Sequence, residues 1–262
     1  MLPPTESDRF ELLERTQGWL VINADDWGQG GDTTKSILGC VRAGTVTSVS
    51  AMVFMEGSEN GAEEARAENV DAGLHINLTT PFTAPGCPKA LRDRQSGVAK
   101  YLRAHCWTRT LFHPLLAADF DYVVRAQLEE FQRLYGAAPT RLDGHHHMHL
   151  CANVLLQRLL PAGTRVRRNL SFAAGDKSVV NRAYRRCIDA ALAHRHRLTD
   201  LLFTLDALRA SGRVEWAMQL ARVRQVEVET HPEVAAERAF LTSGPFRECL
   251  RGVPLVSFAR IH

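Results

Sequence analysis

Short apolar segments alternate with helical segments about seven times along this chain, and this alternation restricts the fold more than any other feature. The first segment, residues 19–24, is an apolar run of the kind found in strands that are covered on both faces of a parallel sheet. Further strands are predicted at residues 46–53, 72–78, 141–143, 164–168, 200–205, 226–230 and 255–258. Repeated βα units predict a parallel sheet, either open or closed into a barrel.

Helices are predicted at residues 33–42, 60–67, 98–110, 120–135, 152–160, 177–194, 215–222 and 247–251. The clearest is 120–135, because Val124, Leu128, Phe131 and Tyr135 form one apolar stripe and Gly136 is a natural stop. We interpret this stripe as simple core packing.

The domain organisation follows from where the alternation holds. Residues 1–17 are predicted to form an N-terminal arm with a short helix over 10–15, and residues 18–262 a single domain. The Pro- and Gly-rich stretch that begins at residue 79 breaks the rhythm, and loops of this length often form lids or binding segments. Residues 79–118 are therefore interpreted as an insertion of loop and helix.

Composition and charge exclude several classes of protein. The 262 residues carry a formal net charge of only +3, without a basic patch interleaved with aromatics, so nucleic acid is not expected as a partner. The six cysteines include no C-x-x-C pair, the N-terminus lacks the apolar core of a secretion signal, and no run is long enough to span a membrane. We expect a cytoplasmic protein with free thiols and, because dimers are the commonest oligomers, a homodimer.

Polar residues follow or lie within four of the predicted strands. Asp25 and Asp26 follow the first strand, His75 lies in the third, His145 follows the strand at 141–143, and His231 follows the strand at 226–230. Functional residues of parallel sheets and barrels gather at the carboxyl ends of the strands. These five residues are therefore predicted to share one site.

Histidines are concentrated in the segment 142–150, which contains His145, His146, His147 and His149. If this segment is extended, His145, His147 and His149 share one face and His146 lies on the other. Neutral imidazole is a common metal ligand and also acts as an acid or base near neutral pH. The alternative is a histidine-rich surface turn without a ligand.

These residue types point to metal-assisted hydrolysis. Two histidines and one carboxylate form a three-ligand set with an open position, as in catalytic zinc sites and some other transition-metal sites. The second aspartate of the Asp25–Asp26 pair can accept a proton from bound water, and a further histidine can protonate the leaving group. The residues alone leave open which aspartate is the ligand. Asn23 and Asn77 would position the aspartates or the substrate, or only satisfy backbone groups.

Three ordered blocks resemble the signature blocks of the YdjC-like carbohydrate deacetylases, which include chitooligosaccharide deacetylases and hopanoid-associated relatives. They are residues 23–28 (NADDWG), 73–79 (GLHINLT) and 142–149 (LDGHHHMH), and segments 44–48 and 229–232 are also similar. The resemblance spans about residues 18–258. It departs from the family at Trp27 (usually Phe), Gly144 (usually Ser) and Glu233 (commonly Gly), and residues 80–118 match no family segment.

The resemblance implies an α/β fold that is (β/α) barrel-like, an irregular seven- or eight-stranded parallel barrel of the glycoside hydrolase or deacetylase type. It implies a metal-dependent hydrolase that removes the N-acetyl group from an amino sugar, N-acetylated oligosaccharide or glycolipid and releases acetate. The cofactor would be one divalent metal ion, Mg²⁺ or Zn²⁺ first, with Mn²⁺, Co²⁺ or Ni²⁺ as alternatives. Residues 18–262 would then form the catalytic domain, and the substrate would be a small N-acetylated sugar or oligosaccharide.

The resemblance also implies roles for individual residues. Asp26, His75 and His145 would hold the metal, with Asp25 as general base and His231 as general acid. The choice of Asp26 follows the more distant polysaccharide deacetylases, in which the second of two aspartates binds metal. Residues implied to bind substrate or to support the ligands are Asn23, Asn77, Asp143, His147, His149 and Arg168. Arg167 or Arg168 would contact sugar hydroxyls or an anionic group, or else both would simply be exposed.

Two other functions fit the same residues. One is a metal-dependent phosphoesterase of the histidine-rich barrel type, which usually needs more carboxylates than the sequence offers next to His145. The other is a non-catalytic protein that binds a metal or a sugar. Metal binding alone requires neither Asp25 nor His231, so their presence favours the hydrolase.

Overall fold

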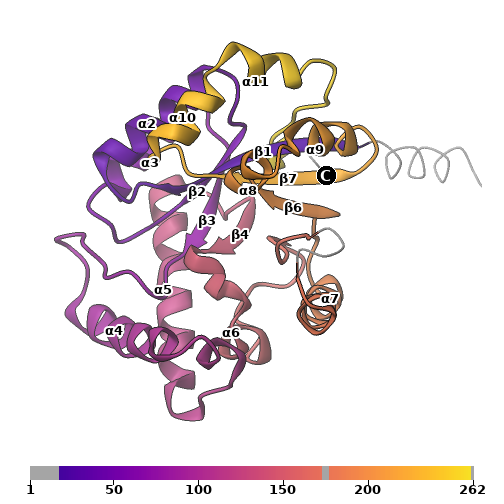
Figure 1. Cartoon of the computed structure of the whole chain (residues 1–262). Coiled ribbons are helices and arrows are strands. Elements are labelled where there is room, and N and C mark those ends of the chain that lie inside the picture. The colour runs from indigo at the N-terminus through magenta and orange to yellow at the C-terminus, as the bar shows by residue number, and fades with distance from the viewer. Residues whose placement is uncertain (1–17, 173–176, 261–262) are drawn as a thin grey trace, which may run out of the picture.

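The computed structural model describes residues 18–172 and 177–260, so the predicted arm and its helix at 10–15 lie outside the described residues. Seven strands form one sheet in the order β5-β4-β3-β2-β1-β7-β6, and all neighbouring strands are parallel (Figure 1). The strands are β1 (Trp19–Trp27), β2 (Ser48–Ala51), β3 (Ala72–Ile76), β4 (Arg141–Gly144), β5 (Arg165–Val166), β6 (Leu201–Thr204) and β7 (Gln225–Thr230). This confirms the predicted α/β fold with a curled, barrel-like parallel sheet.

Helices connect the strands and cover the outside of the sheet (Figure 1). The α-helices are α2 (Gly31–Arg42), α3 (Ser58–Ala67), α4 (Lys89–Ala104), α5 (Ala117–Tyr135), α6 (Ala152–Leu156), α7 (Val179–Ala193), α8 (Leu205–Ala210), α9 (Val214–Leu220), α10 (Ala235–Leu241) and α11 (Gly244–Cys249). The 3₁₀ helices are η1 (Thr108–Thr110), η2 (Pro114–Leu116), η3 (His145–Leu150) and η4 (Phe258–Arg260). Helix α5 buries Val124 and Phe131 and ends at Gly136, which adopts a left-handed φ of 73°, as its stripe predicts.

The structure corrects several predicted elements. The helix predicted at 98–110 is instead α4, which begins at Lys89 and buries Leu91, Val98 and Leu102 on one stripe. The Pro- and Gly-rich stretch was interpreted as a loop up to Gly97, but one glycine in a helix costs only about 1 kcal/mol, which this burial offsets. Residues 255–258 form no strand, since Leu255 makes only an isolated bridge to Leu20. The sequence analysis did not predict α8 and α10.

Strand β1 lies between β2 and β7, and all nine of its residues are buried. Leu20 and Ile22 are fully buried in the main core, whereas Trp19 and Val21 pack with Phe258 in a second cluster. Burying one such side chain contributes about 1.5–3 kcal/mol relative to leaving it in water. This burial holds the carboxyl end of β1 firmly in place, and that end carries both aspartates. No helix among the described residues is long and apolar enough to cross a membrane.

Candidate metal centre and active site

Side chains from three strand ends converge on one point at the carboxyl edge of the sheet. Oδ1 of Asp26 lies 2.9 Å from Nδ1 of His145 and 3.3 Å from Nε2 of His75. All three residues are buried, and their candidate ligand atoms lie within 4.8 Å of one another. The structure therefore brings together the predicted ligand set from residues that are up to 119 positions apart in the sequence (145 − 26 = 119).

The backbone at the end of β1 explains how two adjacent aspartates reach the same site. Successive side chains of a regular strand point to opposite faces. Here the pairing of β1 with β2 shifts register between Ala24 and Trp27, and Asp26 takes a left-handed φ of 65°. This irregularity lets both carboxylates approach His75, since Oδ2 of Asp25 lies 3.8 Å from the same Nε2 atom that Asp26 approaches.

His75 is oriented by Asp143, which lies directly opposite it in the parallel pairing of β3 and β4. Nδ1 of His75 is 2.6 Å from Oδ1 of Asp143. In the neutral form of His75, which is the form that binds a metal, this contact places the proton on Nδ1 and leaves the lone pair on Nε2, which faces Asp26. A carboxylate that orients a histidine in this way is the usual support of a metal ligand. Asp143 thus lies where the sequence predicted a supporting residue.

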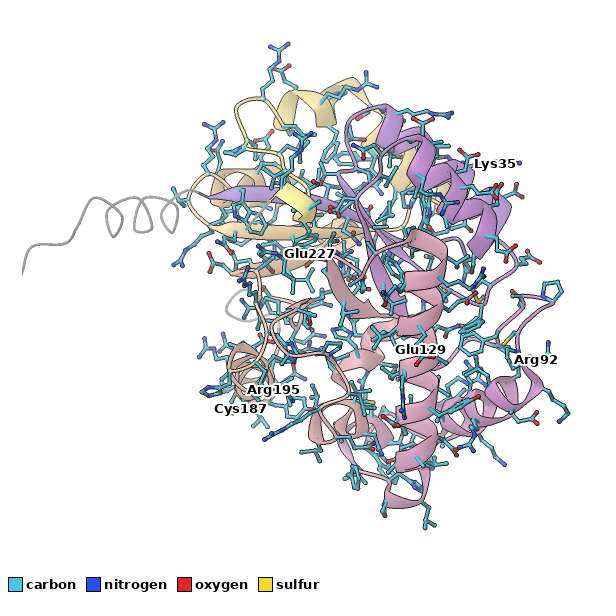
Figure 2. The ribbon with its side chains drawn as sticks, turned by 180° about the vertical axis from the view of Figure 1, so that it is seen from behind. Lys35, Arg92, Glu129, Cys187, Arg195 and Glu227 are labelled. Atoms are coloured by element: carbon cyan, nitrogen blue, oxygen red, sulfur yellow. The ribbon has the colours of Figure 1, made fainter. Side chains whose placement is uncertain are left out.

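A buried network of two arginines and four carboxylates lies beneath this point. Arg167 donates to both oxygens of Asp25, at 2.6 and 2.7 Å, and to Glu227 at 2.8 Å. It also lies 3.2 Å from Glu229 and from Asp143. Arg141 is the second arginine of the network. It forms a very short ion pair with Asp143 and lies 3.5 Å from Glu227. Figure 2 labels Glu227 among the central strands.

Small residues make room for this network. Gly73 on β3 packs against Arg141, and a Cβ atom at this position would lie 2.6 Å from Cγ of Arg141. Any larger residue would displace the buried arginine. Oγ of Ser50 contacts Asp25, Asp143 and Arg141 at 3.1, 2.8 and 2.5 Å. It therefore links Asp25, which binds Arg167, to the ion pair of Arg141 and Asp143.

The histidine segment is not extended, which corrects the predicted alternation of faces. Residues His145–Leu150 form the 3₁₀ turn η3, in which His146 and His147 have left-handed φ values of 56° and 57°. His149 is fully buried, and its Nε2 lies 2.9 Å from the carbonyl oxygen of Arg167, so it supports the network and does not face substrate. His146 instead contacts the hydroxyl of Thr79 at 2.9 Å.

His231, which follows β7, borders the ligand set. Its Nε2 lies 4.0 Å from Oε1 of Glu229, and Nε2 of His147 lies 3.5 Å from Oε2 of the same carboxylate. His231, Glu233 and Asp26 also place candidate ligand atoms within 4.8 Å of one another. Its backbone N–H donates to Glu237 of α10 at 2.8 Å, which fixes the position of the chain after β7. The half-exposed imidazole of His231 is thus held beside Asp26.

The charges of the site shift its pKa values in opposite directions. Burial raises the pKa of Asp25, but the Arg167 and His75 charges outweigh it and hold this pKa well below its usual range. Burial lowers the pKa of His75, but Asp25 and Asp143 outweigh it and raise this pKa to about 10. Burial and Asp25 together raise the pKa of Glu229 to about 7 despite Arg167.

The other histidines also differ from one another. Burial lowers the pKa of His231, but Asp25 and Glu229 outweigh it, so this pKa lies above its ordinary value. Burial and the Arg167 charge lower the pKa of His147 to about 3. The surroundings therefore favour the imidazolium form at His231 relative to an ordinary histidine, and at neutral pH they strongly disfavour it at His147.

The remaining predicted residues lie in different places. Asn23 donates to Asp25 and Ser50, both at 2.7 Å, and therefore positions the aspartate. The side chain of Asn77 bonds mainly to the backbone of Thr79 and Thr80, and also to the sulfur of Met55, so it shapes the turn after β3. The structure does not bring Arg168 into the site, because its guanidinium donates to Asp189 and to backbone carbonyl groups.

Sequence reasoning missed several residues of the network. Arg167 was expected to be exposed or to contact sugar, but it is fully buried among carboxylates. Ser50, Arg141, Glu227 and Glu229 were not singled out. Apolar and polar residues alternate over 225–230, and this pattern could have indicated Glu227 and Glu229. In a sheet whose outer face is covered by helices, the polar side of such a strand must face inwards.

The three candidate ligands fit a divalent cation. Oδ1 of Asp26 is buried and has no hydrogen-bond partner among the described residues, although two imidazole nitrogens lie within 3.3 Å. A buried carboxylate oxygen without a partner is costly, and coordination of a metal would satisfy it. The oxygens of Asp25 and Asp143 are instead already bound by arginine and histidine side chains.

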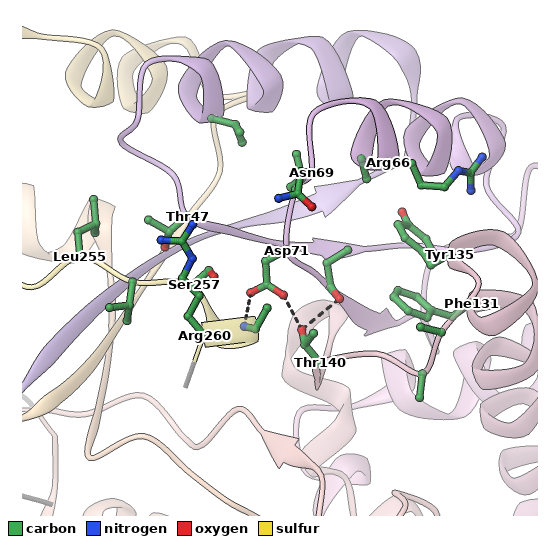
Figure 3. A pocket seen from close by; sticks show the side chains of 18 residues that line it. Thr47, Arg66, Asn69, Asp71, Phe131, Tyr135, Thr140, Leu255, Ser257 and Arg260 are labelled. Atoms are coloured by element: carbon green, nitrogen blue, oxygen red, sulfur yellow. Dashed lines mark hydrogen bonds between the residues drawn. The ribbon is translucent and has the colours of Figure 1, made fainter. Parts of the chain in front are cut away.

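The hollow shown in close-up in Figure 3 lies elsewhere. A cavity of about 740 Å³ is lined by Asn69, Asp71, Thr140 and Arg260 among others, next to the residues that precede β3 and β4 (Figure 3). It therefore lies at the amino ends of these strands, whereas the ligand set lies at the carboxyl ends. Within it, Asp71 accepts hydrogen bonds from Ser48 and Thr140, which tie neighbouring strands together.

Comparison with known proteins identifies a family and several curated relatives. The family model described as "YdjC-like protein" matches residues 19–252. A chitooligosaccharide deacetylase of Proteus mirabilis is 32% identical over 132 residues, which cover 50% of each chain. A carbohydrate deacetylase of Mus musculus is 33% identical over 141 residues, which cover 52% of this chain and 44% of the mouse protein. The chain thus spans about half the length of the curated relatives it matches.

A solved structure shares the fold. It comes from Enterococcus faecalis V583, and its title proposes a role in cellobiose-phosphate cleavage. It aligns with a TM-score of 0.66 at 18% identity and covers 93% of this chain and 98% of its own. The match of the family model to most of the chain, over segments that carry the whole ligand set, shows that this chain belongs to the YdjC-like family.

Proposed function

We propose that this chain is a metal-dependent hydrolase that removes the N-acetyl group from an amino sugar, as the names of its relatives suggest. The observation that carries the proposal is the convergence of Asp26, His75 and His145, flanked by Asp25 and His231. Binding a metal needs only the first three residues. The other two provide a base and an acid at the same point, which amide hydrolysis requires.

One divalent cation is assigned to Asp26, His75 and His145. When bound, it would polarise the acetamide carbonyl and lower the pKa of a water molecule. Two imidazole nitrogens and one carboxylate favour Zn²⁺ over Mg²⁺, which prefers oxygen ligands. Mn²⁺, Co²⁺ and Ni²⁺ share the ligand preference closely enough to be included in any test.

Asp25 is assigned the role of general base. Its pKa lies well below the usual range, so it is ionised at neutral pH. Oδ1 already accepts from Asn23, Ser50 and Arg167, whereas Oδ2 accepts only from Arg167 and lies toward His75. Oδ2 is therefore the oxygen that takes the proton of water as the water oxygen bonds to the carbonyl carbon.

His231 is assigned the role of general acid. Its raised pKa favours the imidazolium form, which donates a proton to the amine nitrogen as the C–N bond breaks. The products are acetate and the free amino sugar. His147, whose pKa is about 3, stays neutral beside Glu229 and does not compete for this role.

The proposal extends to the organisation of the chain. Residues 18–262 are assigned to one catalytic domain, in which residues 79–118, including α4, form the insertion that selects the substrate. Thr79, at the start of this segment, contacts His146 of the histidine turn at 2.9 Å, so the insertion begins at the edge of the site. A small N-acetylated sugar or oligosaccharide is the proposed substrate.

The test is release of acetate from a panel of N-acetylated sugars, using metal-stripped protein to which each divalent ion is added back. Asp25→Asn should lower turnover about 10²- to 10⁴-fold, the usual contribution of a general base, and should leave metal affinity unchanged by calorimetry. Asp32→Asn, a change at an exposed residue of α2, is the matched control. Normal turnover in Asp25→Asn would exclude Asp25 as the base.

A phosphoesterase is the second candidate, because the fold gathers more carboxylates than the sequence around His145 suggested. Asp25, Asp143, Glu229 and Glu233 all belong to groups that can hold a cation. However, Asp25 and Asp143 are already bound by Arg167 and Arg141, which leaves little capacity for a second metal. A stoichiometry of two metals per chain, with hydrolysis of p-nitrophenyl phosphate, would favour this candidate.

A further inference from the structure

Three segments near the candidate active site contain no acidic residue. They are residues 94–118, 144–172 and 177–188, which include η1, η2, α6 and the first part of α7. Together they make up about a quarter of the chain and carry twelve arginines and lysines. Asp176, between the second and third segments, lies outside the described residues. A charge that is so one-sided attracts anionic partners.

The same segments carry most of the large apolar side chains that are exposed. Eight of the twelve such side chains among the described residues lie on them. Single exposed apolar residues are ordinary, but many of them on one part of a surface mark an interaction site. Residues 107–115, which include η1, contribute Trp107, Leu111, Phe112 and Leu115, and Leu115 is 87% exposed. The other four are Leu156 of α6 and Val179, Val180 and Tyr184 of α7.

The elements that carry these side chains are neighbours in the fold. Asn153 of α6 bonds to the backbone N–H and carbonyl groups of His113 at 2.9 and 3.0 Å, which holds residues 107–115 against α6. Residues of η1 and of α7, Thr110 and Tyr184 among them, line one hollow of about 390 Å³. Figure 1 shows α6 and α7 at the end of the molecule toward which β3 and β4 point. We call the exposed side chains of residues 100–115, 156–158 and 177–186 the η1–α7 surface.

Acidic side chains are absent from the η1–α7 surface and are occupied at its edges. Among the described residues, Asp119 accepts a hydrogen bond from Arg94 at 2.7 Å. The buried Asp189 accepts one from Arg168 at 2.7 Å, and its charge also acts on Arg185. The charged side chains that the surface itself exposes are all cations, namely Lys100, Arg103, Arg109, Arg158, Lys177 and Arg186.

Cations mixed with exposed Trp, Phe and Leu, without acids between them, are typical of protein surfaces that lie on an anionic bilayer. The apolar side chains enter the boundary between headgroups and acyl chains, and the cations attract the lipid phosphates. Single-stranded nucleic acid also attracts cations, but it needs aromatic side chains on which bases stack. Five of the eight apolar residues are leucine or valine, which suit acyl chains and offer no stacking.

We propose that the η1–α7 surface binds an anionic membrane surface, with Leu115 and Val180 among the side chains that enter the lipid. The chain would then be held on a bilayer without crossing it. The inference goes beyond the proposed function and does not rest on it, because neither a metal nor a sugar takes part.

Co-sedimentation with lipid vesicles measures this binding on the full chain. Vesicles of phosphatidylcholine alone are compared with vesicles of equal parts phosphatidylcholine and phosphatidylglycerol. The exposed cations should make the chain bind the anionic vesicles at least about tenfold more tightly, and added salt should reduce this preference. Lipids brominated in the acyl chain should quench the emission of Trp107, and Trp107→Phe should lose most of this quenching.

Variants test whether one surface spans both elements. Leu115→Gln in η2 and Val180→Gln in α7 should each weaken binding to anionic vesicles about threefold or more, because each removes one apolar side chain from the lipid. Both side chains are at least 80% exposed, so the changes do not threaten the fold. Val223→Gln is the matched control, since Val223 is 66% exposed but precedes β7 at the opposite edge of the sheet.

The charge is tested in the same way. Arg109→Gln should weaken binding to anionic vesicles about fivefold at low salt, the usual contribution of one cation near such a surface. Arg224→Gln, at an exposed position next to Val223, is the control and should bind as the wild type does.

Four results would overturn the inference. Equal binding to neutral and anionic vesicles would exclude the role of charge, and unchanged binding of both Leu115→Gln and Val180→Gln would exclude this surface. A dimer that the same two substitutions dissociate, measured by light scattering, would assign the surface to a second copy of the chain. Tighter binding of oligothymidylate than of anionic vesicles would assign it to nucleic acid. None of these results bears on the release of acetate, which tests the proposed hydrolysis separately.

Discussion

Replacement of Arg167 by methionine should destabilise the protein more than the replacement of any other charged residue near the candidate active site. The guanidinium is fully buried and donates to Asp25, Glu227 and Glu229. Methionine keeps much of the apolar stem but leaves these three buried carboxylates and Asp143 without their shared cation. Removing one partner of a buried ion pair costs about 3–5 kcal/mol.

This loss can be measured by urea denaturation or by thermal unfolding. For a domain of this size, each 1 kcal/mol lowers the melting temperature by roughly 2–4 °C, so Arg167→Met should lower it by about 6–20 °C. Arg133→Met is the control, since that side chain is 57% exposed and pairs with Glu130 at 2.7 Å on the surface. An exposed pair of this kind contributes about 0–1 kcal/mol. Equal destabilisation by the two changes would refute the reasoning.

The pH dependence separates charge from packing. The Asp25 pKa is lower in the folded chain than in the unfolded chain, so its ionised form contributes stability above the unfolded pKa of about 4 and loses it as pH falls through the folded value. In Arg167→Met the effect of burial dominates and raises the pKa of Asp25. Protonation of Asp25 as the pH falls therefore stabilises the variant. The difference in the free energy of unfolding between wild type and Arg167→Met should become smaller as the pH is lowered from about 8 to about 5. A constant difference would assign the loss to packing alone.

Three further predictions concern the site. Asp143→Asn should weaken metal binding about 10- to 100-fold, because it removes the carboxylate that orients His75, and competition with a zinc chelator would measure this; unchanged affinity would contradict the proposed support. Glu229→Gln should stabilise the protein at about pH 8 but hardly at pH 4. The folded pKa of Glu229, about 7, lies above the unfolded value, so its ionisation lowers the stability of the folded chain as pH rises. Melting curves that show the same difference between variant and wild type at both pH values would exclude this. His231→Gln should lower kcat and abolish the loss of activity at high pH, since this limb reports deprotonation of the acid; a preserved limb in the pH–rate profile would assign it to another group.

The sequence was sufficient to predict the parallel sheet and the meeting of Asp26, His75 and His145. The physical reason is that parallel strands place their carboxyl ends at one edge, so residues at those ends meet whatever their separation in the chain. Strand boundaries are not needed for this inference. It therefore holds despite errors such as the predicted length of β2 and the interpretation of the first part of α4 as a loop.

The buried network was harder to predict. Arg167 and Arg168 stand side by side after a strand of only two residues, too short to show which of them points inwards. The run of histidines contains no glycine or asparagine to mark the left-handed residues His146 and His147. The partner of His75 depends on the register between β3 and β4, which a single sequence does not encode in any visible pattern.

The left-handed backbone of the site implies a conflict between stability and activity. Asp26, His146 and His147 are three of the six residues other than glycine with positive φ among those described. Each such conformation costs about 1 kcal/mol or more, which glycine would largely recover. Selection for thermal stability alone should therefore tend to erase these side chains, and their retention in a stabilised variant would mark them as kept for chemistry.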